Sequence, residues 1–176
     1  MSYSAEYVST GARVGLRPFR HADGPEFTAR VRESRELHRP WLFPPATLEE
    51  YEPYAAQRAA SGFLVCELAG GDIAGFVNVN NIVRGAFQCG ALGYGAFAHA
   101  AGRGLFGEGF DLLLAHAFAA DGLGLHRLEA NIQPGNTASI ALVRGRGFRL
   151  EGLSPEFLYV DGAWRDHERW ALTAAS

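Results

Sequence analysis

The sequence predicts one α+β domain, built on a mostly antiparallel sheet of about seven strands flanked by about four helices. The first observation is the order of the predicted elements: a strand, two helices, three strands, a helix, a strand, a helix and two strands. The second is that short turns join neighbouring strands, which is typical of antiparallel pairing. The third is the length of 176 residues, which suits a single domain over residues 1–176.

The N-terminal third carries one predicted strand and two predicted helices. The strand is RVGLRPF, residues 13–19. Each helix begins with a capping residue that is followed by a glutamate three positions later, namely Asp23 with Glu26 and Thr47 with Glu50. We expect these helices to end near Glu36 and Ala60, with a kink at Pro53 in the second.

The middle of the chain carries three predicted strands and the clearest helix. The strands cover residues 63–69, 73–83 and 86–97, and a Gly-Gly-Asp turn at residues 70–72 joins the first two. Residues 104–121 form the helix. Its apolar residues recur at helical spacing, so that one stripe packs on the sheet: Phe106, Phe110, Leu113, Leu114, Ala117 and Phe118.

The C-terminal third begins with a strand whose two faces differ. In residues 125–133 every second residue is apolar, so Leu128, Ala130 and Ile132 point to one face and Arg127, Glu129, Asn131 and Gln133 to the other. Asn136 is expected to cap a helix that ends near residues 145–147. Asp161 and Gly162 lie between two strand-like runs, which predicts a closing hairpin.

Composition and charge exclude several classes of protein. The net charge is −3, whereas a nucleic-acid-binding domain carries a basic patch. No run approaches the roughly 20 apolar residues that span a membrane, and the opening MSYSAEYVSTGARV has no export signal, so we expect a cytoplasmic location. Cys66 and Cys89 lie in apolar strand-like runs without a C-x-x-C pattern, which predicts buried free thiols.

Metal, hydrolase and kinase chemistry find no support in the sequence. His167 has Asp166 and Glu168 as neighbours, but adjacent residues of a strand point to opposite faces, so the three do not form a metal site. Neither a G-x-S-x-G nucleophile turn nor a P-loop Gly-Lys pair is present. We therefore predict no metal.

The segment HAAGRGLFGEGFD, residues 99–111, contains a G-x-G-x-x-G pattern at Gly102, Gly104 and Gly107. A dinucleotide-binding unit places these glycines directly after a parallel strand and an acidic residue at the end of the next one. Here the residues AHAA separate the glycines from the strand, and Glu129 lies inside its strand. The remaining interpretation is a pyrophosphate-binding loop at the start of a helix. The alternative is a tight turn in which the glycines only allow close packing of the helix.

The run LGYGAFAHAAGRGLFGEG is similar to the acetyl-CoA loop of the GNAT N-acetyltransferase superfamily. HRLEANIQPGNTASIALVRGRGF, followed by EG and LYVDGAWRDH, resembles its RimJ/RimL group, which acetylates N-terminal amines of ribosomal proteins. VGLRPFRHADGPEF and LHRPWL match the N-terminal region of that group. The resemblance implies a GNAT fold with a mixed, splayed sheet, in which the pantetheine arm of acetyl-CoA enters between the strand ending near Phe97 and the strand at 125–133.

The resemblance also implies a set of cofactor-binding residues, which are Ala96, Phe97, Ala101, Gly102, Arg103, Gly104, Gly107, Asn131, Asn136 and Ser139. Backbone N–H groups near Ala96 and Phe97 are expected to polarise the thioester carbonyl. Two positions depart from the family pattern, because His99 stands where Gln or Arg is usual and Ala101 where Arg is usual. We expect weakened cofactor binding, with Arg103 as a compensating residue.

Two residues are candidates for catalysis. Ser139 matches the serine of the group's N-x-x-S motif and is expected to protonate the departing thiolate, although Asn136 and Ser139 could serve only to begin their helix. Glu129 is the candidate general base or amine-orienting carboxylate, with a solvated carboxylate paired to Arg127 as the alternative. The candidate acceptor-binding residues are Trp41, Asn80, Glu129 and Tyr159.

The predicted activity is direct transfer of acetyl from acetyl-CoA to a primary amine, with a protein N-terminal α-amine as the acceptor that the resemblance implies. Two alternatives stay open. One is acetylation of a small amine, such as an amino-sugar or a polyamine. The other is a non-catalytic acyl-CoA-binding or sensor module, given the departures at His99 and Ala101. A homodimer is left open, and neither nucleic acid nor membrane is an expected partner.

Overall fold

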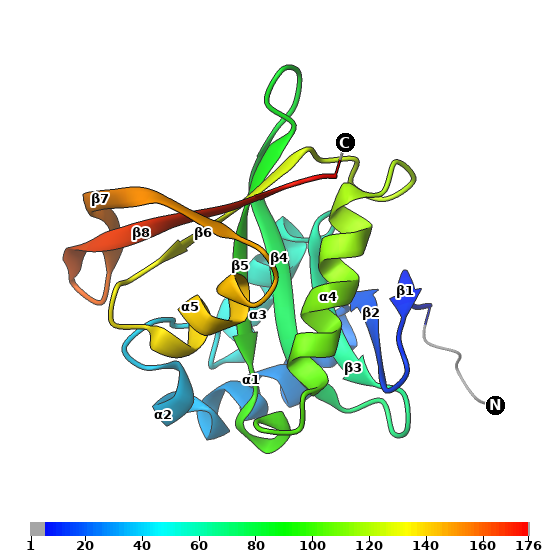
Figure 1. The fold of residues 1–176 in the computed structure, drawn as a ribbon. Coiled ribbons are helices and arrows are strands. Elements are labelled where there is room, and N and C mark those ends of the chain that lie inside the picture. The colour runs from blue at the N-terminus through cyan, green and yellow to red at the C-terminus, as the bar shows by residue number, and fades with distance from the viewer. Residues whose placement is uncertain (1–5, 176) are drawn as a thin grey trace.

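The computed structural model describes residues 6–175 and contains one eight-stranded sheet. The strand order is β1-β2-β3-β4-β5-β6-β8-β7, and every neighbouring pair is antiparallel except β5 and β6, which run parallel (Figure 1). The strands are β1 (Ser9–Thr10), β2 (Val14–Pro18), β3 (Gly62–Glu67), β4 (Ile73–Val83), β5 (Cys89–Ala96), β6 (Arg127–Ile132), β7 (Arg149–Val160) and β8 (Ala163–Thr173).

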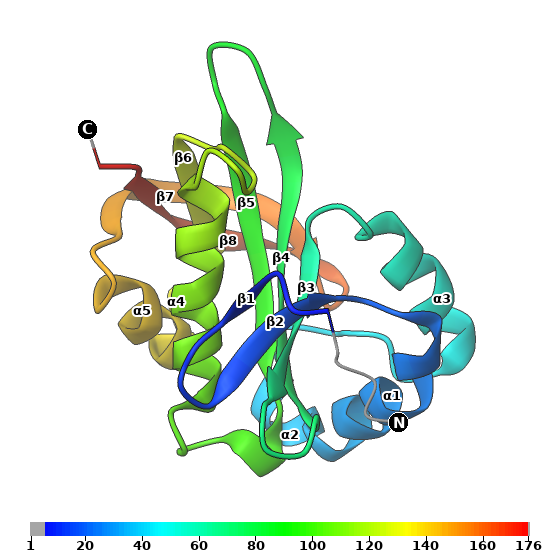
Figure 2. The same ribbon diagram turned by 90° about the vertical axis from the view of Figure 1, so that its right-hand side faces the viewer.

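Five α-helices cover the two faces of the sheet: α1 (Gly24–Glu33), α2 (Arg35–His38), α3 (Leu48–Gln57), α4 (Leu105–Phe118) and α5 (Thr137–Arg144). Figure 2 shows the central strands between α4 on one side and α1 and α3 on the other. Each side has its own apolar core. Phe110, Leu128 and Val143 belong to the core beneath α4 and α5, whereas Phe27 and Phe97 belong to the core beneath α1 and α3.

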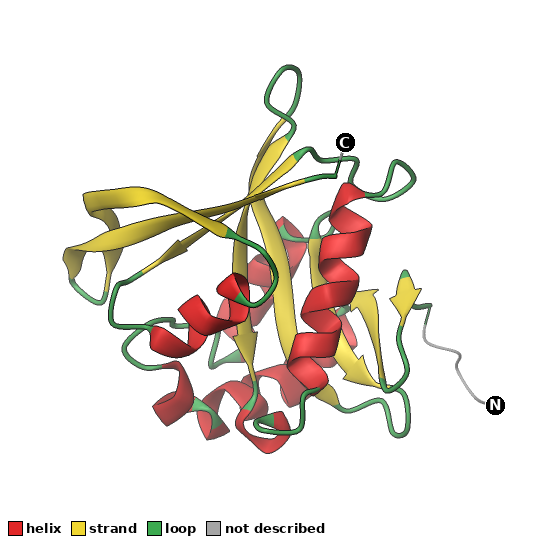
Figure 3. Cartoon of the chain, in the orientation of Figure 1, coloured by secondary structure: helices red, strands yellow, loops and turns green. Residues whose placement is uncertain are grey.

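The strands β5 and β6 are paired over three positions only. Cys89, Gly90 and Ala91 pair with Arg127, Leu128 and Glu129, and beyond them the two strands separate. Each strand then keeps its outer neighbour, since β5 continues along β4 and β6 continues along β8. In Figure 3 the yellow strands fan apart at this point. The divergence predicted for these two strands is therefore confirmed.

Most predicted elements are confirmed, with two additions. The strand β1 has two residues, too few to show a periodic pattern in the sequence. The helix expected to reach Glu36 ends at Glu33 and a separate four-residue helix, α2, follows Ser34. The Ser34 hydroxyl accepts the backbone N–H of Ala98 at 2.9 Å, so tertiary contacts interrupt the helix here. The sheet therefore has eight strands where about seven were expected, and the described residues form five α-helices where about four were expected.

Asp23 occupies the predicted N-cap position of α1, but the predicted capping box with Glu26 does not form, because both carboxylates bond elsewhere. Asp23 accepts two hydrogen bonds from the buried Arg17 guanidinium, at 2.6 and 2.8 Å, and one from the backbone N–H of Arg20. Glu26 accepts the backbone N–H of Ile73 at 2.8 Å. The cap at Thr47 is confirmed, since its hydroxyl accepts the backbone N–H of Glu50.

The remaining sequence expectations concern cysteines, membranes and metals. Cys66 and Cys89 are buried free thiols, as predicted. In the described part of the chain, no helix combines the length and the apolar character needed to cross a bilayer. Across residues 6–175, no three His, Cys, Asp or Glu side chains are grouped in a way that could hold a metal ion.

Candidate active site

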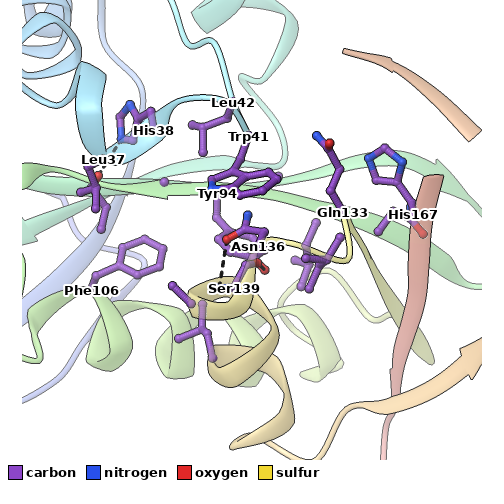
Figure 4. Close-up of a pocket in the computed structure, with 18 residues that line it drawn as sticks. Leu37, His38, Trp41, Leu42, Tyr94, Phe106, Gln133, Asn136, Ser139 and His167 are labelled. Atoms are coloured by element: carbon purple, nitrogen blue, oxygen red, sulfur yellow. Dashed lines mark hydrogen bonds between the residues drawn. The ribbon is translucent and has the colours of Figure 1, made fainter. Parts of the chain in front are cut away.

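A cavity of about 350 Å³ lies where β5 and β6 diverge. Its walls come from α2 and the segment after it, β5, the start of α4, β6, α5 and β8, and its residues are Leu37, His38, Trp41, Leu42, Leu92, Gly93, Tyr94, Gly95, Ala96, Phe106, Asn131, Ile132, Gln133, Asn136, Ala138, Ser139, Leu142 and His167 (Figure 4). The walls thus combine elements from both faces of the sheet. The cavity passes through the sheet at the divergence.

The side of the cavity toward α4 and α5 carries two hydroxyl groups. Tyr94 packs against Phe110 with ring centroids 5.1 Å apart, and its hydroxyl is hydrogen-bonded to the hydroxyl of Ser139. Burial raises the pKa of Tyr94 to about 12, so its hydroxyl stays protonated at neutral pH. Asn136 caps α5 by accepting the backbone N–H of Ser139 at 3.3 Å. This hydroxyl pair can donate a proton to an anion in the cavity.

The edge of β5 presents backbone groups to the gap. The N–H of Phe97 donates to Ala74 of β4 at 2.9 Å, so this N–H is unavailable to a ligand. Because N–H directions alternate along a strand, the N–H groups of Tyr94 and Ala96 point away from β4, toward the gap. Ala96 and Phe97 were the two expected donors to the thioester carbonyl, and of these only the N–H of Ala96 faces the gap.

His38 fixes the same edge from the other side of the sheet. Its Nε2 donates to the carbonyl of Ala96 at 2.7 Å. Since a carbonyl can only accept, Nε2 carries the proton and Nδ1 carries the lone pair. Burial lowers the pKa of His38, which keeps the ring neutral. The ring therefore positions the Ala96 peptide without adding a charge to the cavity.

The glycine pattern forms the start of α4. Gly102 and Gly104 both have a φ of 75°, a left-handed conformation that suits glycine, and Gly104 is the N-cap of the helix. The backbone N–H groups of five residues donate to no acceptor among residues 6–175: Gly102, Gly104, Leu105, Phe106 and Gly107. Together with the helix dipole they form a surface suited to bind an anion, next to the cavity wall at Phe106.

The loop also differs from the expectations for Ala101 and Arg103. The N–H of Ala101 already donates to Ala98, at 3.1 Å. The Arg103 guanidinium is paired with Glu67 at 2.7 Å, and His99 lies 4.0 Å from the same carboxylate. A second guanidinium lies near this helix start, since a Cβ on Gly107 would be 2.7 Å from Nη2 of Arg146, and it is paired with Asp111 at 2.6 Å. The glycine at the helix start was its only sequence signal.

Glu129 lies at the point of divergence but does not line the cavity. Its Oε1 accepts from Arg127 at 2.9 Å and its Oε2 accepts from Arg169 at 3.1 Å, so both oxygens are engaged in ion pairs. Asn131 does line the cavity, and its side-chain oxygen accepts from Arg169 at 2.7 Å. The base role of Glu129 stays a prediction.

The acceptor-binding candidates separate into two groups. Trp41 lies in the cavity wall, where the edge of its indole is close to Gly135. Asn80 lies in a second depression beside Arg58, at the end of α3. Tyr159 is on the outer part of β7, 62% exposed, with its ring against Trp164. The structure therefore brings Trp41 to the cavity and leaves Asn80 and Tyr159 outside it.

His167 is a cavity residue that the sequence analysis considered only as a metal ligand. It is 3% exposed, and its Nδ1 donates to the carbonyl of Arg165 at 2.9 Å. Figure 4 shows its imidazole on β8 beside Gln133, at the opposite end of the cavity from His38. Strand alternation predicts that His167 and its two neighbours point to opposite faces. It does not predict that β8 pairs with β6, which is what brings His167 to the cavity.

Comparisons with known proteins agree with this architecture. A family model described as an acetyltransferase (GNAT) domain matches residues 13–149. The structure of Mycobacterium smegmatis RimJ in complex with CoA-disulfide has a TM-score of 0.81 and 30% identity, and the match covers 92% of this chain and 82% of that one. The predicted GNAT fold is therefore confirmed.

Two curated relatives carry different acceptor names. The ribosomal protein uS5-alanine N-acetyltransferase of Escherichia coli is 38% identical over 102 residues, which are 58% of this chain and 52% of that protein, so the match spans about half of its length. The L-methionine sulfoximine/L-methionine sulfone acetyltransferase of Pseudomonas paraeruginosa is 30% identical over 128 residues, 72% of this chain and 74% of that protein. Since the family model covers most of the chain, this protein belongs to the GNAT acetyltransferase family.

Proposed function

We propose that this enzyme transfers acetyl from acetyl-CoA to the N-terminal α-amine of a protein or peptide, in one step at the cavity between β5 and β6. The observation that carries the proposal is the charge of the cavity: none of its lining residues is Asp, Glu, Arg or Lys. Such a wall favours an acceptor that enters with a neutral amine and without a carboxylate, because unpaired charges are destabilised in a desolvated site.

The residues at the start of α4 suit the diphosphate of CoA. Free N–H groups and a positive helix end favour an anion there. The N–H groups of Tyr94 and Ala96 suit amide and thioester oxygens along the gap. When bound, the thioester supplies an activated acetyl group with a thiolate as the leaving group.

The chain's own groups divide the chemistry between them. Ala96 N–H stabilises negative charge that develops on the acetyl oxygen. The Ser139 hydroxyl donates a proton to the departing sulfur, and the hydrogen bond with Tyr94 holds that hydroxyl in place. Asn136 and the first turn of α5 support Ser139, since a helix start favours developing negative charge.

The acceptor class follows from amine basicity. An α-amine has an unperturbed pKa of about 7.7–8.0, so roughly a third is neutral at pH 7.5, whereas a lysine amine with a pKa of about 10.4 is neutral to about 0.1%. A cavity without carboxylates has no means to bind a polyamine as a cation. The proposal therefore favours the α-amine over lysine and polyamine acceptors.

A free amino acid is the second candidate acceptor, because the Pseudomonas relative is named for one. Its α-amine is more basic than that of a peptide, because the adjacent carboxylate stabilises the ammonium form. Its carboxylate would also be unpaired, since the lining contains no guanidinium or ammonium group and the neighbouring Arg169 already bonds Glu129 and Asn131. A peptide, whose first carboxyl group is an amide, avoids this unpaired charge.

The test is an acceptor panel with acetyl-CoA, read by thiol release and by mass spectrometry. The panel contains a peptide with a free N-terminus and one internal lysine, the same peptide with a blocked N-terminus, methionine sulfone, spermidine and glucosamine. We expect acetylation on the α-amine of the first peptide and none on its lysine. Faster turnover of spermidine or of the blocked peptide would contradict the proposal, and faster turnover of methionine sulfone would favour the amino-acid candidate.

The proposal has two further parts. It includes a cytoplasmic location, where newly made protein N-termini are accessible to an acetyltransferase. It also treats residues 1–176 as one catalytic domain, because both walls of the cavity come from elements that share a single sheet.

A further inference from the structure

We infer that His167 is the general base that takes the proton from the attacking amine, an inference that rests on the proposed function. The starting observation is a buried imidazole in the cavity wall with one nitrogen already bonded. Nδ1 donates to the carbonyl of Arg165, and Nε2 bonds to no group among residues 6–175. A ring fixed in this way is suited to accept a proton at Nε2.

The tautomer of His167 follows from its partner. The Arg165 carbonyl is only an acceptor, so the proton of the neutral ring is on Nδ1 and the lone pair is on Nε2. The same bond sets the orientation of the ring, and Phe157 packs against it with ring centroids 6.1 Å apart. The base is therefore held in one tautomer and one rotamer before an acceptor arrives.

His167 and Ser139 lie on opposite faces of the sheet. Leu128, Ala130 and Ile132 of β6 are buried beneath α5, so Asn131 points to the other face. Asn131 is paired with Arg169, and its bond to that guanidinium places both on one face. His167 lies two residues before Arg169 on β8, so its side chain is on the same face as that of Arg169.

This separation matches what the reaction needs from its two proton-transfer groups. The hydroxyls of Tyr94 and Ser139 lie on the α4 and α5 face, next to the anion-binding helix start. His167 lines the cavity on the other face, and the indole of Trp41 lies beside Gly135, just before the start of α5 (Figure 4). An amine that enters on the His167 side is therefore next to the proposed base, while the hydroxyl pair of Tyr94 and Ser139 lies on the other face.

The charged groups around His167 leave Nε2 free. On its own face the guanidinium of Arg169 stacks 4.3 Å from the Phe157 centroid and is paired with Glu129. Asp166 and Glu168 point to the other face, where Asp166 accepts the N–H of Glu156 and Glu168 accepts the indole N–H of Trp170. From β6 and the residue after it the neighbouring cavity groups are the uncharged Asn131 and Gln133, and His38 lies at the opposite end of the cavity (Figure 4).

The proposed step balances in atoms and electrons. The lone pair of the neutral amine forms the C–N bond with the acetyl carbon, and His167 Nε2 takes the N–H proton as that nitrogen becomes positive. The C–S bond breaks with its electron pair on sulfur, and sulfur takes a proton from Ser139. Ser139 is reprotonated and the imidazolium of His167 is deprotonated by water, which leaves an amide and a thiol.

The experiment compares wild type with His167→Asn and His167→Gln, using the free peptide as acceptor between about pH 5.5 and 9. The Asn amide can still donate to Arg165, and the Gln carbonyl can still accept a hydrogen bond from the amine, but neither is a base. We expect kcat/KM to fall about 100-fold in both variants. In a plot of log kcat/KM against pH, the acid limb should have slope 2 for wild type, because both the amine and the imidazole must lose a proton. The slope should be 1 for both variants, in which only the amine must lose one.

The controls separate this inference from the proposed function. His21→Asn removes an exposed histidine whose side chain is 84% exposed, and it should keep slope 2. The affinity for acetyl-CoA, measured by calorimetry, should be unchanged in both His167 variants. An acid-side slope of 1 in wild type, or near-wild-type turnover in His167→Gln, would overturn the base assignment. A wild-type enzyme that acetylates no α-amine in the panel would instead overturn the proposed function.

Discussion

The hydroxyls of Tyr94 and Ser139 are hydrogen-bonded to each other between β5 and α5. Tyr94 belongs to the part of the sheet that continues along β4, and Ser139 belongs to the helix that packs on β6. The bond therefore connects the two halves of the diverging sheet at the cavity wall. Because burial raises the pKa of Tyr94 to about 12, this connection is between neutral hydroxyls at physiological pH.

Replacing Ser139 with alanine removes the proposed proton donor to sulfur while leaving the anion-binding helix start intact. We expect kcat to fall about 100-fold and KM for acetyl-CoA to change less than about two-fold, because the lost interaction forms only as the C–S bond breaks. Steady-state kinetics with the free peptide measure both values. As a control, Thr137→Ala removes an exposed hydroxyl from the first turn of α5, the helix that carries Ser139, and should change neither kcat nor KM. Equal losses in the two variants would refute the donor role.

The pH dependence on the basic side tests Tyr94. The raised pKa means that the hydroxyl remains protonated in the range where an ordinary tyrosine, with a pKa of 10.0, ionises. We therefore expect kcat to stay level up to about pH 10.5 if the donor pair is intact. Stopped assays over that range measure it. A decline centred at pH 10 that disappears in Tyr94→Phe would contradict the assignment.

The buried pair of Arg17 and Asp23 is the clearest stability prediction. Both side chains are 9% exposed and share two hydrogen bonds. Asp23→Asn leaves the guanidinium buried without its counter-charge, so we expect a loss of about 3–5 kcal/mol in the free energy of unfolding. Urea denaturation measures this loss. Glu33→Gln breaks the exposed pair with Arg30 and should change stability by less than about 1 kcal/mol.

Glu108 links α4 to the start of β2, and its contribution depends on pH. Its carboxylate accepts the backbone N–H of Arg13 at 2.7 Å and the guanidinium of the same residue at 3.0 Å. These bonds hold the pKa of Glu108 below its ordinary 4.5, so the stabilisation is complete above about pH 5 and is lost as pH falls through the folded-state pKa.

We expect Glu108→Gln to be about 1–2 kcal/mol less stable than wild type at pH 7. The difference should shrink as the pH is lowered toward 3. Denaturation midpoints at several pH values measure the trend. A difference that is constant over this range would show that packing, not charge, accounts for the effect.

Local patterns predicted the elements that depend on neighbouring residues. The alternation from Leu128 to Ile132 gave both faces of β6, and the Asp161–Gly162 turn gave the β7–β8 hairpin. The cap at Thr47 depends on a residue three positions away and was found. Resemblance to GNAT proteins added the divergence of β5 and β6, which no single segment encodes.

The missed features depend on pairings between distant residues. Asp23 has the sequence context of a helix cap, but Arg17 comes close only once β2 is in the sheet, and it binds that carboxylate. His167 becomes a cavity residue because β8 pairs with β6, about 35 residues earlier in the chain. Asn80 depends on the same kind of distant pairing, since the register of β4 places it in a second depression.

The short pairing of β5 with β6 links catalysis to thermal resistance. Where β5 and β6 separate, backbone N–H and C=O groups lack a strand partner, and the amide groups of a bound ligand can form hydrogen bonds with them. A ligand in this gap then takes the place of an additional strand. Acetyl-CoA at about a thousand times its dissociation constant would then raise the free energy of unfolding by about 4 kcal/mol. Purified enzyme is accordingly expected to melt several degrees higher when saturated, and to resist proteases best while loaded.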